Sequence, residues 1–370
     1  MKTYPLPSLS LEEARALQFK IVDTVTRHFD GVQILSTGDL GVVKGLNKPT
    51  YTRRVEQVLA EVFGAEDAVL VRGAGTGAIR WGLTALFRSG KKLLVHRAPV
   101  YPTTQVSLES MDAELVRADF NELDDVRRVL SENPDITGAL VQLTRQKIDD
   151  RYDCAEVIAA IRSQNPSVKI LTDDNYAALK VPKIGVQCGA DLSSFSCFKL
   201  LGPEGVGALL GRRAMVQDVA RCNYSGGSQV QGHEAMEVLR GMVYAPVALA
   251  IQAQVNRELV ERLRSGEIPE VKDAFLANAQ SKVLLVEFRE NIAERVLDFA
   301  LRHGAAAHPV GCESKYEFVP MIYRVSGTFR KQDPSLEKRM IRINPMRGGA
   351  ETVMRILKEA VAEAKSEKLD

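Results

Sequence analysis

Four polar positions in this sequence each follow a short apolar run, and together they could carry out covalent chemistry. Lys199 follows the run DLSSF and precedes a glycine-containing turn. An amine in an apolar setting loses hydration, and this activates it as a nucleophile toward a carbonyl group. An isolated lysine is more often a surface residue whose charged head stays in water. The other three positions decide between these interpretations.

The second position is the segment RGAGTGA at residues 72–78, which follows the apolar run DAVLV and precedes a helical pattern. Backbone amides at a helix N-terminus attract phosphate, so this loop could receive one. A tight strand-to-helix turn is the plain alternative, and a dinucleotide would fit the loop almost as well. A nicotinamide dehydrogenase expects an acidic residue about 20 positions further on. That neighbourhood here is RSGKKLLVHR, which counts against a dehydrogenase.

The remaining two positions are an aromatic residue and a carboxylate. Tyr101 lies in a short loop after the run KKLLVH, where its ring could stack on a planar cofactor or simply pack in the loop. Asp173 closes the run VKILTD, and a carboxylate behind a buried strand must be paired or face a cleft. A phosphate loop, a stacking ring, a carboxylate and an imine-forming lysine, in this chain order, are what pyridoxal 5'-phosphate (PLP) requires.

The order and the residue types of these segments resemble those of the fold type I PLP enzymes, the aspartate aminotransferase superfamily. The front half is most similar to class V aminotransferases and to the cysteine and methionine metabolism branch, and the whole resembles the YhfS group. The resemblance implies that Lys199 carries PLP as an imine, that Asp173 pairs with the pyridine nitrogen and that Tyr101 stacks on the ring. Asp174 is the fallback for Asp173. The phosphate ligands implied are Gly75, Thr76, Gly77 and Ser196.

Two further segments could reach across a dimer, the first by resemblance to the family and the second by its glycine content. Tyr51 and Arg53 match a pair that contacts the neighbouring subunit's cofactor phosphate, although they could equally be the exposed start of a helix. Ser225 and Gly226 lie in a glycine-rich loop that could add an anion contact or be an ordinary turn. These matches predict a homodimer with active sites at the interface.

An amino-acid substrate needs a partner for its carboxylate. Arg342 lies in an apolar strand where the family keeps its carboxylate-binding arginine, and a planar guanidinium suits a bidentate contact. Arg145 could recognise a second anionic group. The pattern also departs from the family, because Phe198 replaces the usual hydroxyl before the lysine and Gly207 replaces an arginine eight residues after it. Phosphate binding must therefore differ in detail.

The residue types do not distinguish among the reactions that such a site supports. An aminotransferase is the principal prediction, with a PLP-dependent carbon–sulfur or other β/γ-elimination lyase, or a racemase, as alternatives. A regulator that merely carries the cofactor would need a DNA-binding segment, and no helix-turn-helix pattern or basic arm is evident.

The elements that must position these residues are those of a doubly wound α/β domain. Two amphipathic helical segments come first, and from residue 67 short apolar runs alternate with helical stretches, as parallel strands and crossover helices do. The tail segments VLLVEF, MIYRVSGTF and KRMIRINP are expected to be strands of a smaller α+β domain. We expect an N-terminal helical segment and arm at 1–64, the PLP-binding domain at 65–250 and the small domain at 251–370.

The composition limits the possible binding partners and the cellular location of the protein. The net charge of +2 over 370 residues gives no basic stripe for nucleic acid or anionic membranes. The sequence shows neither an apolar run of membrane-spanning length nor a secretory signal, so a cytoplasmic location is expected. Five cysteines without a CxxC spacing and five histidines without a grouped motif predict no disulfide framework and no metal site.

Overall fold

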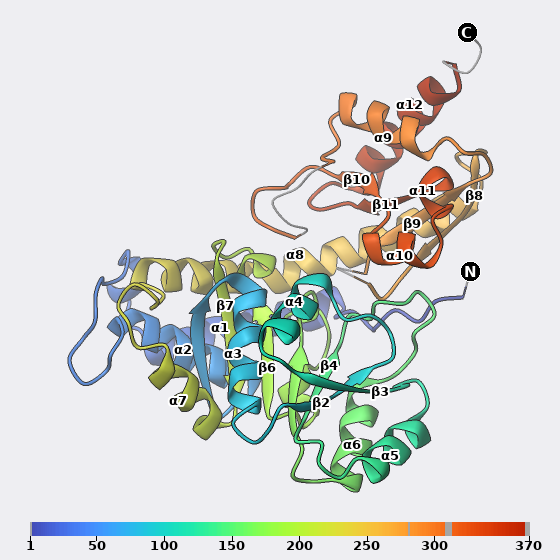
Figure 1. Ribbon diagram of the computed structural model, residues 1–370. Coiled ribbons are helices and arrows are strands. Elements are labelled where there is room, and N and C mark those ends of the chain that lie inside the picture. The colour runs from blue at the N-terminus through green and yellow to red at the C-terminus, as the bar shows by residue number, and fades with distance from the viewer. Residues whose placement is uncertain (1, 280–281, 308–312, 367–370) are drawn as a thin grey trace. The chain divides into compact units, whose positions relative to one another are not determined.

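The computed structural model describes residues 2–279, 282–307 and 313–366. Contacts divide the chain into two compact units. The large unit comprises residues 12–144 and 151–247, and the small unit comprises residues 1–11, 145–150 and 248–370. Helix α8 begins in the large unit and ends in the small unit (Figure 1).

The elements follow one another in an order that matches the alternation expected from the sequence. Up to the long helix they are α1 (Leu11–His28), η1 (Gln33–Leu35), α2 (Thr50–Phe63), β1 (Asp67–Arg72), α3 (Ala74–Leu86), β2 (Lys92–His96), α4 (Pro102–Ser110), β3 (Glu114–Ala118), α5 (Leu123–Glu132), β4 (Gly138–Gln142), α6 (Cys154–Gln164), β5 (Lys169–Asp173), η2 (Gly185–Cys188), β6 (Leu192–Ser196), η3 (Cys197–Leu200), β7 (Val206–Gly211), α7 (Arg213–Cys222) and α8 (Gly232–Arg264). The remainder are β8 (Val271–Leu276), β9 (Leu284–Phe288), α9 (Ala293–Arg302), β10 (Met321–Arg324), α10 (Gly327–Gln332), α11 (Leu336–Arg339), β11 (Met340–Asn344) and α12 (Ala350–Ser366).

The large unit is built on a seven-stranded sheet in the order β1-β7-β6-β5-β4-β2-β3. Strand β7 runs antiparallel to both neighbours, and the ladder from β6 to β3 is parallel. The expected large, mostly parallel sheet is therefore confirmed. Because parallel strands end at the same edge, the residues that follow β4, β5 and β6 come together there.

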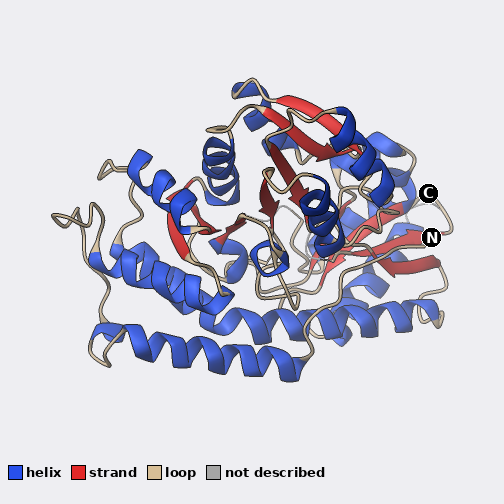
Figure 2. Ribbon diagram, turned by 90° about the horizontal axis from the view of Figure 1, so that it is seen from below, coloured by secondary structure: helices blue, strands red, loops and turns tan. Residues whose placement is uncertain are grey.

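The two faces of this sheet are covered by different helices, which lie on both sides of the strands (Figure 2). On one face Leu171 of β5 packs against α3, where a Cβ added to Gly82 would lie 2.7 Å from the Leu171 side chain. On the other face Thr172 meets η2 at Gly185, and Phe195 packs on Phe63 of α2 with ring centroids 5.4 Å apart. Since side chains alternate along a strand, Asp173 lies on the α3 face and Asp174 does not.

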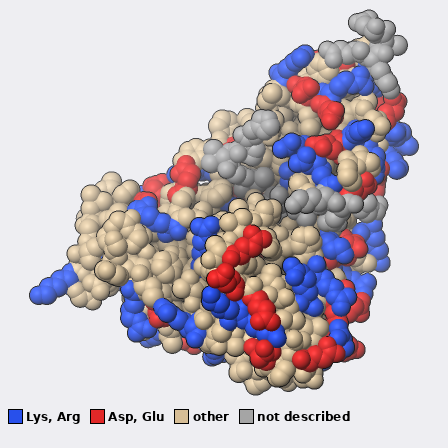
Figure 3. Space-filling model, viewed as in Figure 1, with Lys and Arg blue, Asp and Glu red and all other residues tan. Residues whose placement is uncertain are grey.

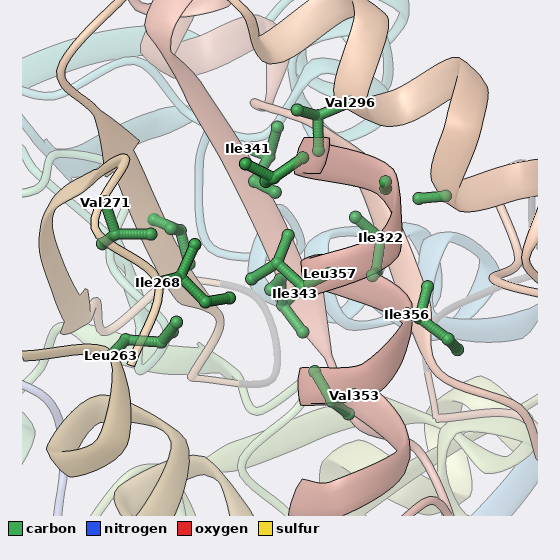
Figure 4. Close-up of a cluster of buried hydrophobic side chains, with 14 of the residues drawn as sticks. Leu263, Ile268, Val271, Val296, Ile322, Ile341, Ile343, Val353, Ile356 and Leu357 are labelled. Carbon is green, nitrogen blue, oxygen red and sulfur yellow. The ribbon is translucent and has the colours of Figure 1, made fainter. Parts of the chain in front are cut away.

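The small unit has its own sheet and its own core. Its four strands are antiparallel in the order β10-β11-β9-β8. Helix α12 packs the apolar side chains Val353 and Leu357 toward Ile341 and Ile343 of β11, with Val296 of α9 nearby (Figure 4). This confirms the smaller α+β domain as a fold class.

The structure corrects one expected strand and adds two. The segment MIYRVSGTF is a strand only at Met321–Arg324, because Ser326 caps a new helix by accepting a hydrogen bond from the Phe329 amide at 3.2 Å. Strands β7 and β8 were not predicted. Glycines interrupt the apolar pattern of β7, and charged residues interrupt that of β8, so neither has a simple periodicity.

Charged side chains lie on the surface of the protein, and its most apolar long helix is partly buried. Basic and acidic side chains are interspersed over much of the face shown in Figure 3, and fewer of them lie at the end that carries residues 30–45. Helix α8 is long and apolar enough to cross a membrane by length and composition, and 56% of its most apolar window is buried inside the protein. Core helices of soluble proteins have the same properties. Cys154, Cys188, Cys197 and Cys222 are free thiols, and Cys312 lies outside the described residues.

Candidate active site

Lys199 lies on the short 3-10 turn η3, directly after the buried strand β6. The turn ends at Leu201, whose φ of 62° is left-handed and stops any helical continuation. The side chain is half-buried, and its Nζ lies 3.8 Å from the centroid of the Tyr176 ring. Nζ also donates to Asn175 Oδ1 at 3.4 Å. The lysine is therefore held at the edge of the sheet among residues that follow β5.

Asp173 is the last residue of β5 and is 5% exposed. Its Oδ1 accepts hydrogen bonds from the backbone amide of Asn175 at 3.1 Å and from Asn175 Nδ2 at 2.7 Å. Burial raises the pKa of Asp173, while the hydrogen bonds from Asn175 and the charge of Lys199 act in the opposite direction. The carboxylate thus shares its surroundings with the lysine.

Asp174, the fallback, belongs to a different environment. It is fully buried on the opposite face, where it accepts from Thr172 Oγ1 at 2.8 Å and from the Gly185 amide at 3.2 Å. Burial raises the pKa of Asp174 to about 7. The geometry therefore favours Asp173 over Asp174 as the carboxylate that works with Lys199.

Asn175 is a site residue that the sequence reasoning missed. Its Oδ1 accepts from the Ser196 amide at 3.0 Å as well as from Lys199, and its Nδ2 binds Asp173. A Cβ added to Gly75 would lie only 2.5 Å from Asn175 Oδ1, so α3 also reaches this side chain. The amide joins three predicted segments. The signal in the sequence was its position two residues after Asp173, at the mouth of the sheet.

The glycine loop forms the N-terminus of α3. The amides of Gly73 and Ala74 donate to Gly205 O at 2.8 and 3.1 Å, and the Gly77 amide donates to Gly73 O at 2.8 Å. Helix geometry gives the amides of Gly75 and Thr76, in the first turn, no carbonyl within the helix. These two amides are the donors that an anion would meet.

Ser196 and Gly207 complete the candidate phosphate site. Ser196 is 1% exposed, and its Oγ has no hydrogen-bond partner among the described residues. A buried hydroxyl without a partner is costly, and a phosphate oxygen would satisfy it. A Cβ on Gly207 would lie 2.1 Å from Ala74 O, so this position has no room for the family's arginine. The residues present therefore fit a phosphate-bearing cofactor held mainly by amides and a hydroxyl.

Tyr101 stands at the N-cap of α4 and is 41% exposed. Two residues later, Thr103 Oγ1 lies 3.1 Å from Thr76 Oγ1. The loop that carries the ring is thus connected to the first turn of α3.

The structure holds Tyr51 and Arg53 in contacts within the chain. Arg53 Nη1 donates to Asp67 Oδ1 at 2.8 Å and to Glu56 Oε2 at 3.3 Å, and the Tyr51 ring lies 5.9 Å from that of Phe29. Their predicted contact with a neighbouring subunit stays a prediction.

Ser225 and Gly226 lie in an exposed turn in which Ser225 O accepts from the amides of Ser228 at 2.9 Å and Gln229 at 3.1 Å. A Cβ on Gly226 would lie 3.5 Å from Val42, so the turn is next to residues 30–45, the segment called the arm below. Its role as an anion contact also stays a prediction.

The two predicted substrate arginines belong to the small unit. Arg342 is 8% exposed on β11, its Nε donates to Arg324 O at 2.7 Å, and its guanidinium carbon lies 4.1 Å from the centroid of the Tyr323 ring. Arg145 is 3% exposed and donates to Tyr4 O of the N-terminal segment. Arg342 is therefore oriented by the Tyr323 ring, whereas Arg145 is occupied by its hydrogen bond to the Tyr4 carbonyl.

Comparison with known proteins places the chain in a family. Residues 53–244 match the family model of class V aminotransferases, and residues 257–357 match that of the YhfS-like C-terminal domain. The protein YhfS of Escherichia coli (strain K12) is 55% identical over 98% of this chain and 99% of its own length. A mouse cysteine desulfurase is 26% identical, over 74% of this chain and 64% of its own.

Solved structures of other proteins have the same fold as this chain. The PLP-dependent protein YhfS from Escherichia coli superposes with a TM-score of 0.95 at 55% identity, over 98% of this chain and 100% of that one. A methionine gamma lyase from Micromonospora echinospora gives a TM-score of 0.71 at 19% identity, over 94% of this chain and 98% of that one, and so shares the fold. The chain therefore belongs to the class V aminotransferase family of fold type I PLP-dependent enzymes, as a homologue of YhfS.

Proposed function

We propose that this protein binds PLP covalently at Lys199 and transforms an amino acid, in the manner of an aminotransferase. The observation that carries the proposal is the chain of contacts from Lys199 through Asn175 to the buried carboxylate of Asp173. When bound, PLP supplies an electron sink for charge that develops at the α carbon of an amino acid. Membership of this family also favours the phosphate of PLP over a dinucleotide as the ligand of the glycine loop at residues 72–78.

The phosphate would bind at the N-terminus of α3. The amides of Gly75 and Thr76 point out of the first turn, and the helix dipole favours an anion there. The orphaned Ser196 hydroxyl is the third donor. In this proposal Gly77 serves the site by letting the helix turn closely past Arg72 O, from which a Cβ would be 2.0 Å away.

Asp173 and Lys199 would divide the proton chemistry between them. A carboxylate held by Asn175 can keep a proton on the pyridine nitrogen. The Lys199 amine would remove a proton from the α carbon of the substrate and return it. Asn175 and the Tyr176 ring keep Nζ in position for this transfer.

Binding and orientation would fall to residues outside this pair. The Tyr101 ring would stack on the pyridine. Arg342 would bind the substrate carboxylate, because its stacked guanidinium is already fixed in direction. Arg145 would meet a second anionic group only if its contact with Tyr4 were exchanged.

The reaction type is tested by product analysis. The purified protein with PLP is given a panel of amino acids, and keto acid, ammonia and loss of chirality are measured in parallel. An aminotransferase yields more than one keto acid per PLP only with an acceptor present, because the amino group otherwise stays on the cofactor. A β/γ-elimination lyase releases ammonia without one, and a racemase changes chirality alone. Ammonia release without an acceptor would replace the aminotransferase proposal with the lyase alternative.

The assembly and location are also proposals. Exposed apolar side chains gather on and beside the arm of the large unit, and the end of the molecule that carries the arm shows few charged side chains in Figure 3. They are Val32, Leu35, Leu40, Val42, Val43 and Tyr224. Such a patch favours a homodimer formed through the large unit, with the predicted trans contacts nearby. The location we propose is the cytoplasm.

A further inference from the structure

We propose that Asn175 is the positioning residue of this site, holding the Asp173 carboxylate and the Lys199 amine in one fixed arrangement. The inference rests on the proposed function, but it concerns a residue that neither the family resemblance nor the sequence pattern singled out.

The direction of the Asn175 amide is fixed by its partners. The Ser196 backbone amide and Lys199 Nζ are both donors, and both lie within hydrogen-bond distance of Oδ1, at 3.0 and 3.4 Å. The oxygen must therefore face them. Nδ2 then faces Asp173 Oδ1, 2.7 Å away, and donates to it.

The side chain is also confined. Asn175 is 8% exposed, and its backbone amide donates to the same Asp173 oxygen at 3.1 Å. Its backbone carbonyl accepts from Thr144 Oγ1 at 3.2 Å. A Cβ on Gly75 would lie 2.5 Å from Oδ1 and 2.7 Å from Nδ2, so α3 leaves the amide no room to rotate on that side.

These contacts give the amide two opposite electrostatic effects. As a donor it stabilises the ionised form of Asp173, and as an acceptor it stabilises a protonated nitrogen on Lys199. Changing Asn175 should therefore alter the protonation of the lysine nitrogen in the cofactor-loaded enzyme, which a merely structural residue would not do.

The test is the pH midpoint of the visible absorption band of the protein with bound PLP. Asn175→Asp keeps the size and the acceptor oxygen that faces Lys199, but it replaces the donor to Asp173 by a second carboxyl, so the two carboxyls compete for one proton. We expect the midpoint to rise, because part of the negative charge of this pair then lies within hydrogen-bond distance of the Lys199 nitrogen and favours its protonated form. Asn175→Ala removes the acceptor, so its midpoint should fall below that of the unmodified protein.

Asn121 is a matched control, because its Nδ2 donates to Asp119 Oδ1 two residues before it at 2.9 Å, and its Oδ1 accepts the amides of Arg151 at 2.7 Å and Tyr152 at 3.1 Å. It follows β3, at the far edge of the sheet from β6. Asn121→Asp should change thermal stability and leave the midpoint where it was.

An unchanged midpoint in Asn175→Asp, with a borohydride-reducible adduct still formed, would overturn the inference while leaving the proposed function standing. Asn175→Asp decides the matter alone if the alanine variant does not fold, since it conserves the shape of the side chain. A wild-type protein that forms no visible band with PLP would overturn the proposed function first, and this inference with it.

Discussion

At the scale of the residue, the two neighbouring carboxylates at the end of β5 have different surroundings because strand side chains alternate between faces. Asp173 shares its face with α3 and is held by Asn175, next to Lys199. Asp174 points to η2 and binds Thr172 and the Gly185 amide. The sequence left both open, because alternation shows that two adjacent residues differ but not which one faces the ligand.

Asp174 predicts a pH dependence of stability. The pKa of Asp174 is about 7 in the folded protein, above its ordinary value of 3.8, so the folded protein retains a proton that the unfolded chain releases. With respect to this group, stability is greatest below about pH 4 and falls as the pH rises toward about 7. We expect Asp174→Asn, which cannot ionise, to lose this part of the pH dependence. The measurement is the melting temperature at about pH 4.5 and about pH 8.

The contrasting variant is Asp173→Asn. It should retain PLP but lose turnover by about 100-fold or more, because the pyridine nitrogen loses its charged partner. If Asp174→Asn were instead the variant that lost turnover with PLP bound, the two roles would have to be exchanged.

Arg342 predicts a binding effect. Arg342→Ala should raise KM for the amino acid by about 10-fold or more while the spectrum of bound PLP stays unchanged, because a charge-assisted bidentate contact is lost. Arg339→Ala is the control, since Arg339 pairs with Asp333 and Glu287 in the same unit. An unaltered KM in Arg342→Ala would remove Arg342 from the substrate site.

At the scale of the element, the first turn of α3 depends on the absence of a side chain at Gly75. Gly75→Ala would place a Cβ 2.5 Å from Asn175 Oδ1 and displace the amide that binds Ser196. We expect the dissociation constant for PLP to rise by about 10-fold or more, although alanine favours a helix over glycine by roughly 1 kcal/mol. A fluorescence titration with PLP measures it.

Gly31→Ala is the control, because a Cβ there meets no heavy atom within 4 Å. Equal PLP affinity in the Gly75 and Gly31 variants would show that Asn175 can move without cost, and that the close contact between α3 and Asn175 does not affect cofactor binding.

The sequence predicted most strands of the large sheet and the edge at which the candidate site lies. Short apolar runs located β1 to β6, and the residues after them identified the sheet edge where Lys199, Asp173 and Gly75 meet. Asn175 was missed because its role comes from close approach of α3, which no local pattern encodes. The apolar residues that continue after Met321 predict one strand, but the Ser326 cap starts a helix there.

At the scale of the whole molecule, each unit has its own sheet, and the residues proposed for the cofactor belong to the large unit whereas Arg342 belongs to the small one. A sequence can indicate two cores by its periodicity, but the pairing of distant segments depends on tertiary packing. Segment 145–150, which joins the small unit from within the large one, is an example.

The proposed homodimer predicts a mass of twice the 40.7 kDa chain in solution. Leu40, 73% exposed on the arm, should contribute to the interface, so Leu40→Asp should shift the protein toward monomer in sedimentation equilibrium. Leu301→Asp, at a position 55% exposed on α9, is the control and should stay dimeric. A monomeric wild type would contradict the dimer.

Whether Lys199 carries the cofactor is measured by absorbance during titration with PLP, followed by borohydride reduction and peptide mapping. We predict that the wild-type protein develops a yellow band and, after reduction, carries PLP on the peptide that contains Lys199. Lys199→Ala should develop no such band and yield no reduced adduct. A borohydride-reducible adduct in Lys199→Ala, or a wild-type protein that takes up no PLP, would show that Lys199 does not carry the cofactor.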